Sequence, residues 1–146
     1  VTPPETVSSA EPLALLLVSV VPPLLTVSAV VPMVSAEVVL VSQKAKDDPV
    51  RWVYLDIGRF GGLAETEGEC IKYAFRTPHD GTQEGPVTIA GPTCDSVDTL
   101  YEKSNYRLPE ALVDGDRVEI LSTGAYVTTY ASQKFNGFAP LAEHYI

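Results

Sequence analysis

The sequence predicts a mainly β domain over residues 35–146, of the Greek-key β-barrel or sandwich type, with one or two short helices. Three observations lead to this fold class. Short runs rich in β-branched and aromatic residues recur along the chain, and turn-forming pairs such as Asp-Pro, Gly-Pro and Asp-Gly separate them. Residues 117–122 also alternate between polar and apolar side chains, as a half-buried strand does.

The first elements are predicted to form a hairpin. Residues 36–42 are a valine-rich run, Asp47-Asp48-Pro49 is a turn, and residues 50–57 add Trp, Tyr and further β-branched residues. Residues 61–72 contain Ala and Glu, which favours one short helix.

The later elements are short strands and turns. Residues 87–90 form a strand that ends at Gly91-Pro92, and residues 97–105 are expected to contain short turns. The tight turn at 114–116 leads into the alternating strand 117–122. Residues 125–131, rich in Tyr and Thr, are the last strand candidate.

Residues 1–34 differ from the rest of the chain. They hold only Glu5 and Glu11 as charges and six of the twelve prolines. A signal peptide would need a basic residue before the apolar run, and Pro22, Pro23 and Pro32 would break a membrane-spanning helix. We interpret this segment as foreign to the native domain, such as a damaged end or an out-of-frame translation; a buried strand pair is the alternative.

Composition limits the function classes. The chain has 146 residues and a net charge of −9, which argues against nucleic acid as a partner because phosphate binding needs clustered Lys and Arg. The two cysteines and two histidines show no metal-ligand spacing, so no metal site is predicted. Nothing indicates secretion or membrane association, so we expect a reducing, cytoplasmic setting.

Residues 91–98 carry the clearest chemical pattern. They read Gly-Pro-Thr-Cys-Asp-Ser-Val-Asp and follow a predicted strand, so their side chains should lie on a loop at a sheet end. Carboxylates one and four positions after Cys94 disfavour a thiolate, which suits a proton donor, and Asp95 could bind an ammonium group. The residues alone also allow a small buried Cys and loop-capping aspartates.

This stretch resembles the GPTCDSxD signature of the fold-III, pyridoxal-phosphate-dependent decarboxylases of basic amino acids. Residues 52–66 are similar to the bacterial ornithine/lysine type of the segment entering the active site, and 124–126 and 135–138 to the last two motifs of that family. The four motifs occur in the family's order, and the similarity covers residues 35–146.

The resemblance implies the C-terminal β-domain of a homodimeric enzyme that makes putrescine from ornithine or cadaverine from lysine in polyamine biosynthesis. The β/α-barrel with the cofactor's lysine is missing. Carried over, Cys94 would return a proton to the substrate carbon after carbon dioxide leaves, and Asp95 would hold the distal ammonium across the dimer interface. Tyr126 would bind the phosphate of pyridoxal 5'-phosphate, and Phe135 would line the substrate slot.

Two features depart from the family pattern. Ile57 stands where the eukaryotic ornithine enzymes have Asp, so its neighbour Asp56 is expected to take part of the substrate-binding role. No lysine lies in the Schiff-base context, and the stretch before Ser35 has no glycine where a phosphate loop is expected. The chain alone could therefore also be a non-catalytic interaction module or a decayed fragment.

Overall fold

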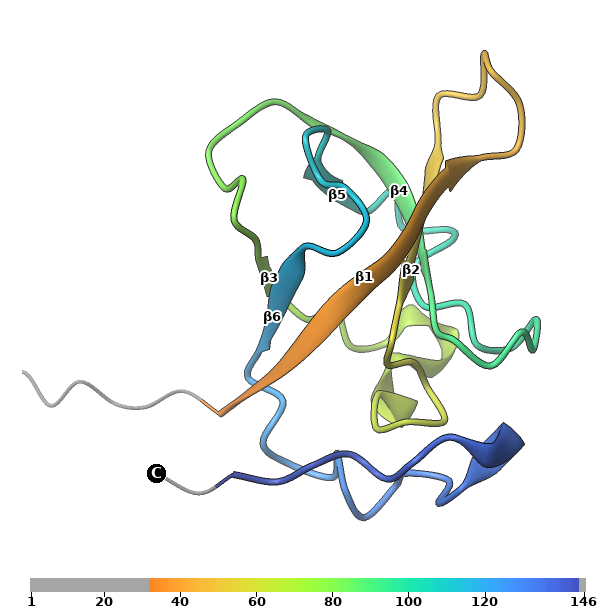
Figure 1. The fold of residues 1–146 in the computed structure, drawn as a ribbon, viewed down its shortest axis with the longest axis vertical. Coiled ribbons are helices and arrows are strands. Elements are labelled where there is room, and N and C mark those ends of the chain that lie inside the picture. Colours follow the sequence, from red (N-terminus) through yellow and green to blue (C-terminus); the bar gives the residue numbers. More distant parts are fainter. Residues whose placement is uncertain (1–31, 145–146) are drawn as a thin grey trace, which may run out of the picture.

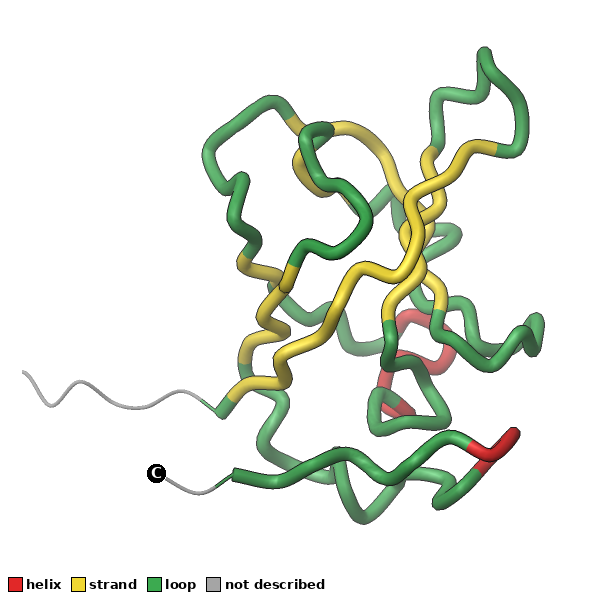
Figure 2. The backbone as a smooth tube through the Cα atoms, in the orientation of Figure 1, coloured by secondary structure: helices red, strands yellow, loops and turns green. Residues whose placement is uncertain are grey.

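The computed structural model describes residues 32–144 and is built on one curled, six-stranded sheet (Figure 1). The sheet order is β3-β6-β1-β2-β4-β5. The strands are β1 (Met33–Gln43), β2 (Arg51–Leu55), β3 (Phe75–Arg76), β4 (Glu84–Ala90), β5 (Arg107–Pro109) and β6 (Arg117–Leu121). Two short 3₁₀ helices, η1 (Ala64–Glu69) and η2 (Phe135–Gly137), complete the described part, and loops join the rest (Figure 2). The predicted mainly β class is confirmed.

Strand β1 is the centre of the sheet and the cause of its curl. Its N-terminal half pairs with β6, and its C-terminal half pairs with β2. The register with β2 shifts between Val38 and Leu40, so Val39 is an extra residue at a bulge. Val39 and Leu40 are both exposed, and the inward alternation of side chains changes phase there. The bulge bends β1 and lets one strand serve both halves of a half-barrel.

The predicted hairpin is confirmed, since β1 and β2 pair antiparallel on either side of the turn at 44–50. The sequence did not predict that β2 and β4 pair in parallel, with Trp52 opposite Thr88 and Tyr54 opposite Ala90. A parallel pair needs a crossover. Here η1 and β3 lie within that crossover, between residues 55 and 84.

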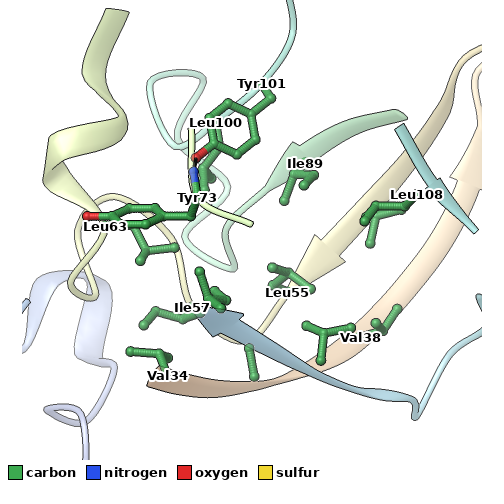
Figure 3. Packing of buried hydrophobic residues seen from close by; sticks show 14 of the residues in the cluster. Val34, Val38, Leu55, Ile57, Leu63, Tyr73, Ile89, Leu100, Tyr101 and Leu108 are labelled. Carbon is green, nitrogen blue, oxygen red and sulfur yellow. Dashed lines mark hydrogen bonds between the residues drawn. The ribbon is translucent and has the colours of Figure 1, made fainter. Parts of the chain in front are cut away.

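The core lies inside the curl of the sheet (Figure 3). Leu55 of β2, Ile89 of β4 and Ile120 of β6 are each 0–1% exposed. Full burial of such a side chain stabilises the fold by about 1.5–3 kcal/mol relative to an exposed one. Leu100 and Leu112, from the loops around β5, belong to the same core.

A group of tyrosines fixes the loop before β3. The Tyr101 hydroxyl accepts from the Tyr73 amide at 2.9 Å (Figure 3). The same hydroxyl donates to the Ile71 carbonyl at 3.0 Å. The Tyr106 hydroxyl donates to the Tyr73 carbonyl at 2.6 Å, and the rings of Tyr101 and Tyr106 stack at 4.7 Å. The Ile71 carbonyl and the Tyr73 amide and carbonyl are therefore satisfied by side chains rather than by a strand partner.

The prediction of a strand at 125–131 is wrong. This segment forms turns, with the Tyr130 amide donating to the Tyr126 carbonyl at 2.9 Å. Strand β6 already has β1 and β3 as its two neighbours, so no free edge adjoins it. The segment is instead fixed by one buried side chain, Val127, which packs on Gly62, where a Cβ would lie 2.9 Å from its Cγ1.

The predicted helix at 61–72 is present only as the shorter η1, which Gly68 at φ +63° interrupts. At the N-terminal side, β1 begins at Met33, and Val34 is 6% exposed in the core, slightly before the predicted boundary at residue 35. Our interpretation of the preceding residues 1–31 lies outside the described residues. Within 32–144, no helix has the length and apolar character to span a membrane.

Candidate active site

The loop predicted to be chemically active directly follows strand β4. Residues Val87–Ala90 of this strand are all buried, and Gly91-Pro92 ends the strand at the sheet's end. The loop that follows returns to β4, because the Gly91 amide donates to the Asp98 carbonyl at 2.8 Å and the Leu100 amide to the Ile89 carbonyl at 2.7 Å. These backbone hydrogen bonds therefore anchor residues 91–98 to strand β4.

Asp98 is the buried centre of this loop, with 1% of its surface exposed. One carboxylate oxygen accepts the Arg59 amide at 2.7 Å. The other accepts the Thr93 hydroxyl at 2.7 Å and the Thr93 amide at 3.2 Å. A buried carboxylate is stable only with such partners, so Asp98 joins the loop after β2 to the loop after β4.

Two glycines make room for Asp98. A Cβ on Gly58 would lie 2.7 Å from the Gly91 Cα and closer still to the Asp98 carboxylate. A Cβ on Gly91 would lie 2.5 Å from the Asp98 Cγ. Side chains at either position would push the carboxylate from its hydrogen bonds. The glycines of the sequence motifs are thus explained by close approach of the two loops.

Cys94 stands at the outer turn of the loop. Its φ is +59°, a left-handed conformation that is uncommon for a residue with a Cβ. The thiol is exposed, and its sulfur lies 3.8 Å from the Pro92 carbonyl oxygen. The loop therefore presents the thiol outward from the domain.

Asp95 is exposed beside Cys94 and differs from Asp98 in every contact. One of its carboxylate oxygens accepts the Val97 amide at 2.8 Å, and within 32–144 the other has no hydrogen-bond donor. Its backbone carbonyl accepts the Asp98 amide at 2.9 Å. The structure brings Cys94 and Asp95 together as an outward-facing thiol and carboxylate.

Asp56 lies at the end of β2 and is exposed. One carboxylate oxygen accepts the Glu37 amide at 2.8 Å, and the Asp56 amide donates to the Glu37 carbonyl at 3.0 Å. The next residue, Ile57, is 4% exposed and belongs to the core. Of these two residues, Asp56 is therefore the one whose side chain lies at the surface.

A cleft of about 250 Å³ lies between the end of the sheet and the C-terminal segment. Phe60 and Phe135 form one part of it, with stacked rings 4.0 Å apart. The cleft also touches Asp56 and Thr93, whereas Cys94, Asp95 and Tyr126 are not part of its wall. The lining residues are Ser35, Asp56, Ile57, Gly58, Phe60, Gly61, Pro92, Thr93, Ala131, Ser132, Gln133, Phe135, Phe138, Ala139, Pro140 and Leu141.

The C-terminal turn is tied to the cysteine loop. The Asn136 side-chain amide donates to the Thr93 carbonyl at 2.9 Å, and the Ser132 amide donates to the Phe60 carbonyl at 2.8 Å. These contacts tie the turn that carries Phe135 to the residue that precedes Cys94. Sequence reasoning missed Thr93 and Asn136, although both lie inside the motifs it used.

Tyr126 is 54% exposed, with φ +62° and its ring stacked on Tyr130 at 4.9 Å. No hydrogen bond within 32–144 occupies its hydroxyl. A free phenol can donate to a phosphate oxygen brought from outside the domain, so Tyr126 fits a contact to a phosphorylated cofactor.

The fold and this loop define a class of protein: a curled β-domain that presents a thiol and a carboxylate from one sheet end. The family model for the C-terminal sheet domain of the pyridoxal-dependent decarboxylases matches residues 32–124. The chain therefore belongs to this family. It spans about a fifth of the length of the curated relatives that it matches.

Two relatives illustrate the range of the family. The lysine/ornithine decarboxylase of Selenomonas ruminantium is 32% identical over 87 residues, 60% of this chain and 21% of that protein. The diaminopimelate decarboxylase of Helicobacter pylori strain J99 is 37% identical over 97 residues, 65% of this chain and 22% of that protein.

Crystal structures of the family share the fold. The lysine/ornithine decarboxylase from Vibrio vulnificus complexed with cadaverine has a TM-score of 0.62 and 33% identity, covering 75% of this chain and 28% of that one. The complex of SrLDC with PLP and cadaverine has a TM-score of 0.63 and 28% identity, covering 75% and 26%. Pyridoxal phosphate is the cofactor of this family.

Proposed function

We propose that this chain acts as the C-terminal part of a pyridoxal-phosphate-dependent decarboxylase of ornithine or lysine, in polyamine biosynthesis, and supplies the Cys94–Asp95 half of a site shared by two subunits. The observation that carries this proposal is the outward presentation of both side chains on a loop anchored by a buried carboxylate. Within residues 32–144, neither Cys94 nor Asp95 lines the cleft described above.

Cys94 is the proposed proton donor. Pyridoxal phosphate, when bound, supplies the electron sink that allows the substrate to lose carbon dioxide. The exposed thiol would then give its proton to the carbon that lost the carboxylate, and regain one from solvent. A rigid loop suits this role because the donor must be within hydrogen-bond reach of one atom.

Asp95 is the proposed partner of the substrate's distal ammonium. The carboxylate oxygen of Asp95 that has no donor within residues 32–144 can accept a charge-assisted hydrogen bond. A carboxylate here favours a diamino acid that ends in a cation over one that ends in a second carboxylate. We therefore favour ornithine and lysine over diaminopimelate, although relatives of both kinds are similar to this chain.

Three further residues would complete the contribution of this domain. Asp56 and Phe135 face the same cleft, so one could attract an ammonium while the other packs on an alkyl chain. Tyr126 would donate to the cofactor phosphate. We place the enzyme in the cytoplasm, which is consistent with the unpaired Cys70 and Cys94.

Exposed apolar side chains on the loop and on the C-terminal segment support a shared, homodimeric site. Val97, within the loop, is 52% exposed, and Phe138, at the cleft, is 44% exposed. Tyr126 and Tyr130 add two exposed aromatic rings from the C-terminal segment. Apolar groups gathered beside polar ones are typical of a surface that a partner covers.

The substrate test uses the complete protein that contains this domain, assayed for carbon dioxide release from ornithine, lysine, diaminopimelate and arginine. We expect kcat/KM for ornithine or lysine to exceed that for diaminopimelate by at least about 100-fold, because a site built for one polar group rejects its analogue strongly. Asp95→Glu should reduce activity on ornithine and lysine. Asp47→Glu, in the exposed β1–β2 turn, is the matched control and should change nothing. Preference for diaminopimelate would contradict the proposal.

A further inference from the structure

Cys94 lies between two residues whose backbones are both attached to Asp98. On one side, the amide and hydroxyl of Thr93 donate to one Asp98 carboxylate oxygen. On the other side, the carbonyl of Asp95 accepts the Asp98 amide at 2.9 Å. Asp98 thus holds both neighbours of Cys94, while its second oxygen fixes the loop to the Arg59 amide.

The conformation of Cys94 needs this support. A residue with a Cβ at φ +59° is strained and persists only where its surroundings determine it. The thiol's nearest polar contact, the Pro92 carbonyl at 3.8 Å, is too long to impose a backbone conformation. The contacts that can impose it are those on Thr93 and Asp95.

We infer that Asp98 is a positioning residue for Cys94, holding it in the left-handed conformation that turns its thiol out of the domain. The conformational part of this inference concerns the described domain alone. Its catalytic meaning rests on the proposed function, in which Cys94 donates the proton. Asp98 touches no reacting atom in that scheme and acts through Thr93 and Asp95.

The test is nuclear magnetic resonance on the isotopically labelled full chain. A positive φ shortens the distance between a residue's own amide and α protons, so Cys94 should give a strong intraresidue cross-peak. Asp98→Ala should abolish that cross-peak and speed exchange of the Thr93 and Arg59 amides by about tenfold or more, since both lose their acceptor. Glu69, Asn105, Ser122 and Lys134 also have positive φ and should keep their cross-peaks as internal references.

Two variants serve as matched controls. Asp95→Ala removes a carboxylate next to Cys94 but keeps Asp98, so the Cys94 cross-peak should remain. Thr93→Val removes the hydroxyl that donates to Asp98, whereas Thr93→Ser keeps it. If Asp98→Ala fails to fold, this pair decides: the cross-peak should weaken in Thr93→Val and persist in Thr93→Ser.

Several outcomes would overturn the inference. These are a wild-type chain without the Cys94 cross-peak, an Asp98→Ala chain that keeps it and, where Asp98→Ala loses all five cross-peaks through general unfolding, a Thr93→Val chain whose Cys94 cross-peak is as strong as that of Thr93→Ser. In the complete enzyme, Asp98→Ala should lower kcat about tenfold or more with little change in KM. An inactive wild-type enzyme with the expected spectra would reject the proposed function and leave the positioning role standing.

Discussion

Asp95 and Asp98 are three residues apart and have opposite tasks, because one is exposed and the other is 1% exposed. The buried carboxylate is fully engaged by three backbone and hydroxyl donors. The exposed one keeps an oxygen available for a cation. Asp98 therefore maintains the conformation of the loop, whereas Asp95 is available to bind a ligand.

Replacing Cys94 by Ala in the complete enzyme should leave cofactor binding intact, because in the proposed enzyme the cofactor's lysine would come from another domain. Carbon dioxide should still be lost, but protonation would lack its positioned acid. The product-forming step should slow by about 10²–10⁴-fold where protonation limits turnover. Amine and aldehyde products measured together would show a larger share of misplaced protonation. Cys70→Ala, at the other exposed thiol, should behave as wild type.

Replacing Asp95 by Ala should act on binding instead. Loss of the ammonium's partner should weaken substrate binding by about 2–5 kcal/mol, as for a desolvated charge pair that loses one member. Steady-state kinetics with ornithine and lysine would show it mainly as a raised KM. Asp47→Ala is the matched control, since that carboxylate lies in the exposed β1–β2 turn. An unchanged KM in Asp95→Ala would contradict the assigned role.

The sequence identifies Cys94 and Asp95 as candidates because residues 91–98 resemble a decarboxylase signature, and their types suit proton donation and ammonium binding. It does not separate the role of Asp98 from that of Asp95, because both are aspartates in one loop. The difference is burial, which depends on how Gly58 and Gly91 let two distant loops approach. Thr93 and Asn136 were missed for the same reason, since their bond joins residues 43 positions apart.

Among the elements, the tyrosine group before β3 gives a stability prediction. The Tyr106 hydroxyl is the donor to the Tyr73 carbonyl. Tyr106→Phe should lower the free energy of unfolding by about 1–3 kcal/mol, because a partly buried carbonyl loses its partner. Urea unfolding of the chain measures this. Tyr130→Phe is the control, since that ring is 56% exposed, and it should have no effect.

The same tyrosines predict a loss of stability in alkali. Burial, followed by the nearby Tyr101, raises the pKa of Tyr106 to about 12, and burial followed by the Glu65 carboxylate raises the pKa of Tyr73 to about 12. An unfolded chain would ionise both near pH 10. Their contribution is therefore complete below about pH 10 and is lost as pH rises from 10 to 12. Urea midpoints at pH 9 and 11 should show this drop, and Tyr106→Phe should reduce it.

At the scale of the strands and helices, the sequence pattern predicted the features that interactions between nearby residues determine. The β1–β2 hairpin and the alternating β6 follow from turn residues and side-chain period. The strand expected at 125–131 failed because its Tyr and Thr residues favour strands only where a sheet edge is free, and β6 has none. The parallel β2–β4 pair was missed because pairing across a long crossover leaves no local pattern.

For the whole molecule, the first prediction concerns the lysines. All five lie between Lys44 and Lys134, and all are exposed on the described domain. An exposed lysine has no pocket that holds and orients a cofactor, so none should form a preferred Schiff base with pyridoxal phosphate. Borohydride reduction and peptide mapping of the chain would reveal the sites. Stoichiometric labelling of one lysine would mean that this chain holds the cofactor itself.

The central claim is that this domain completes the active site of a neighbouring subunit. Subunit mixing tests it most directly: a complete enzyme carrying Cys94→Ala, which should form product only slowly, is combined with one that lacks the cofactor's lysine and should be inactive by itself. With random exchange, half of the dimers are mixed and each keeps one intact site of two, so activity should recover to about a quarter of wild type. No recovery, in a mixture where subunit exchange is independently demonstrated, would contradict the claim that Cys94 is supplied across the interface.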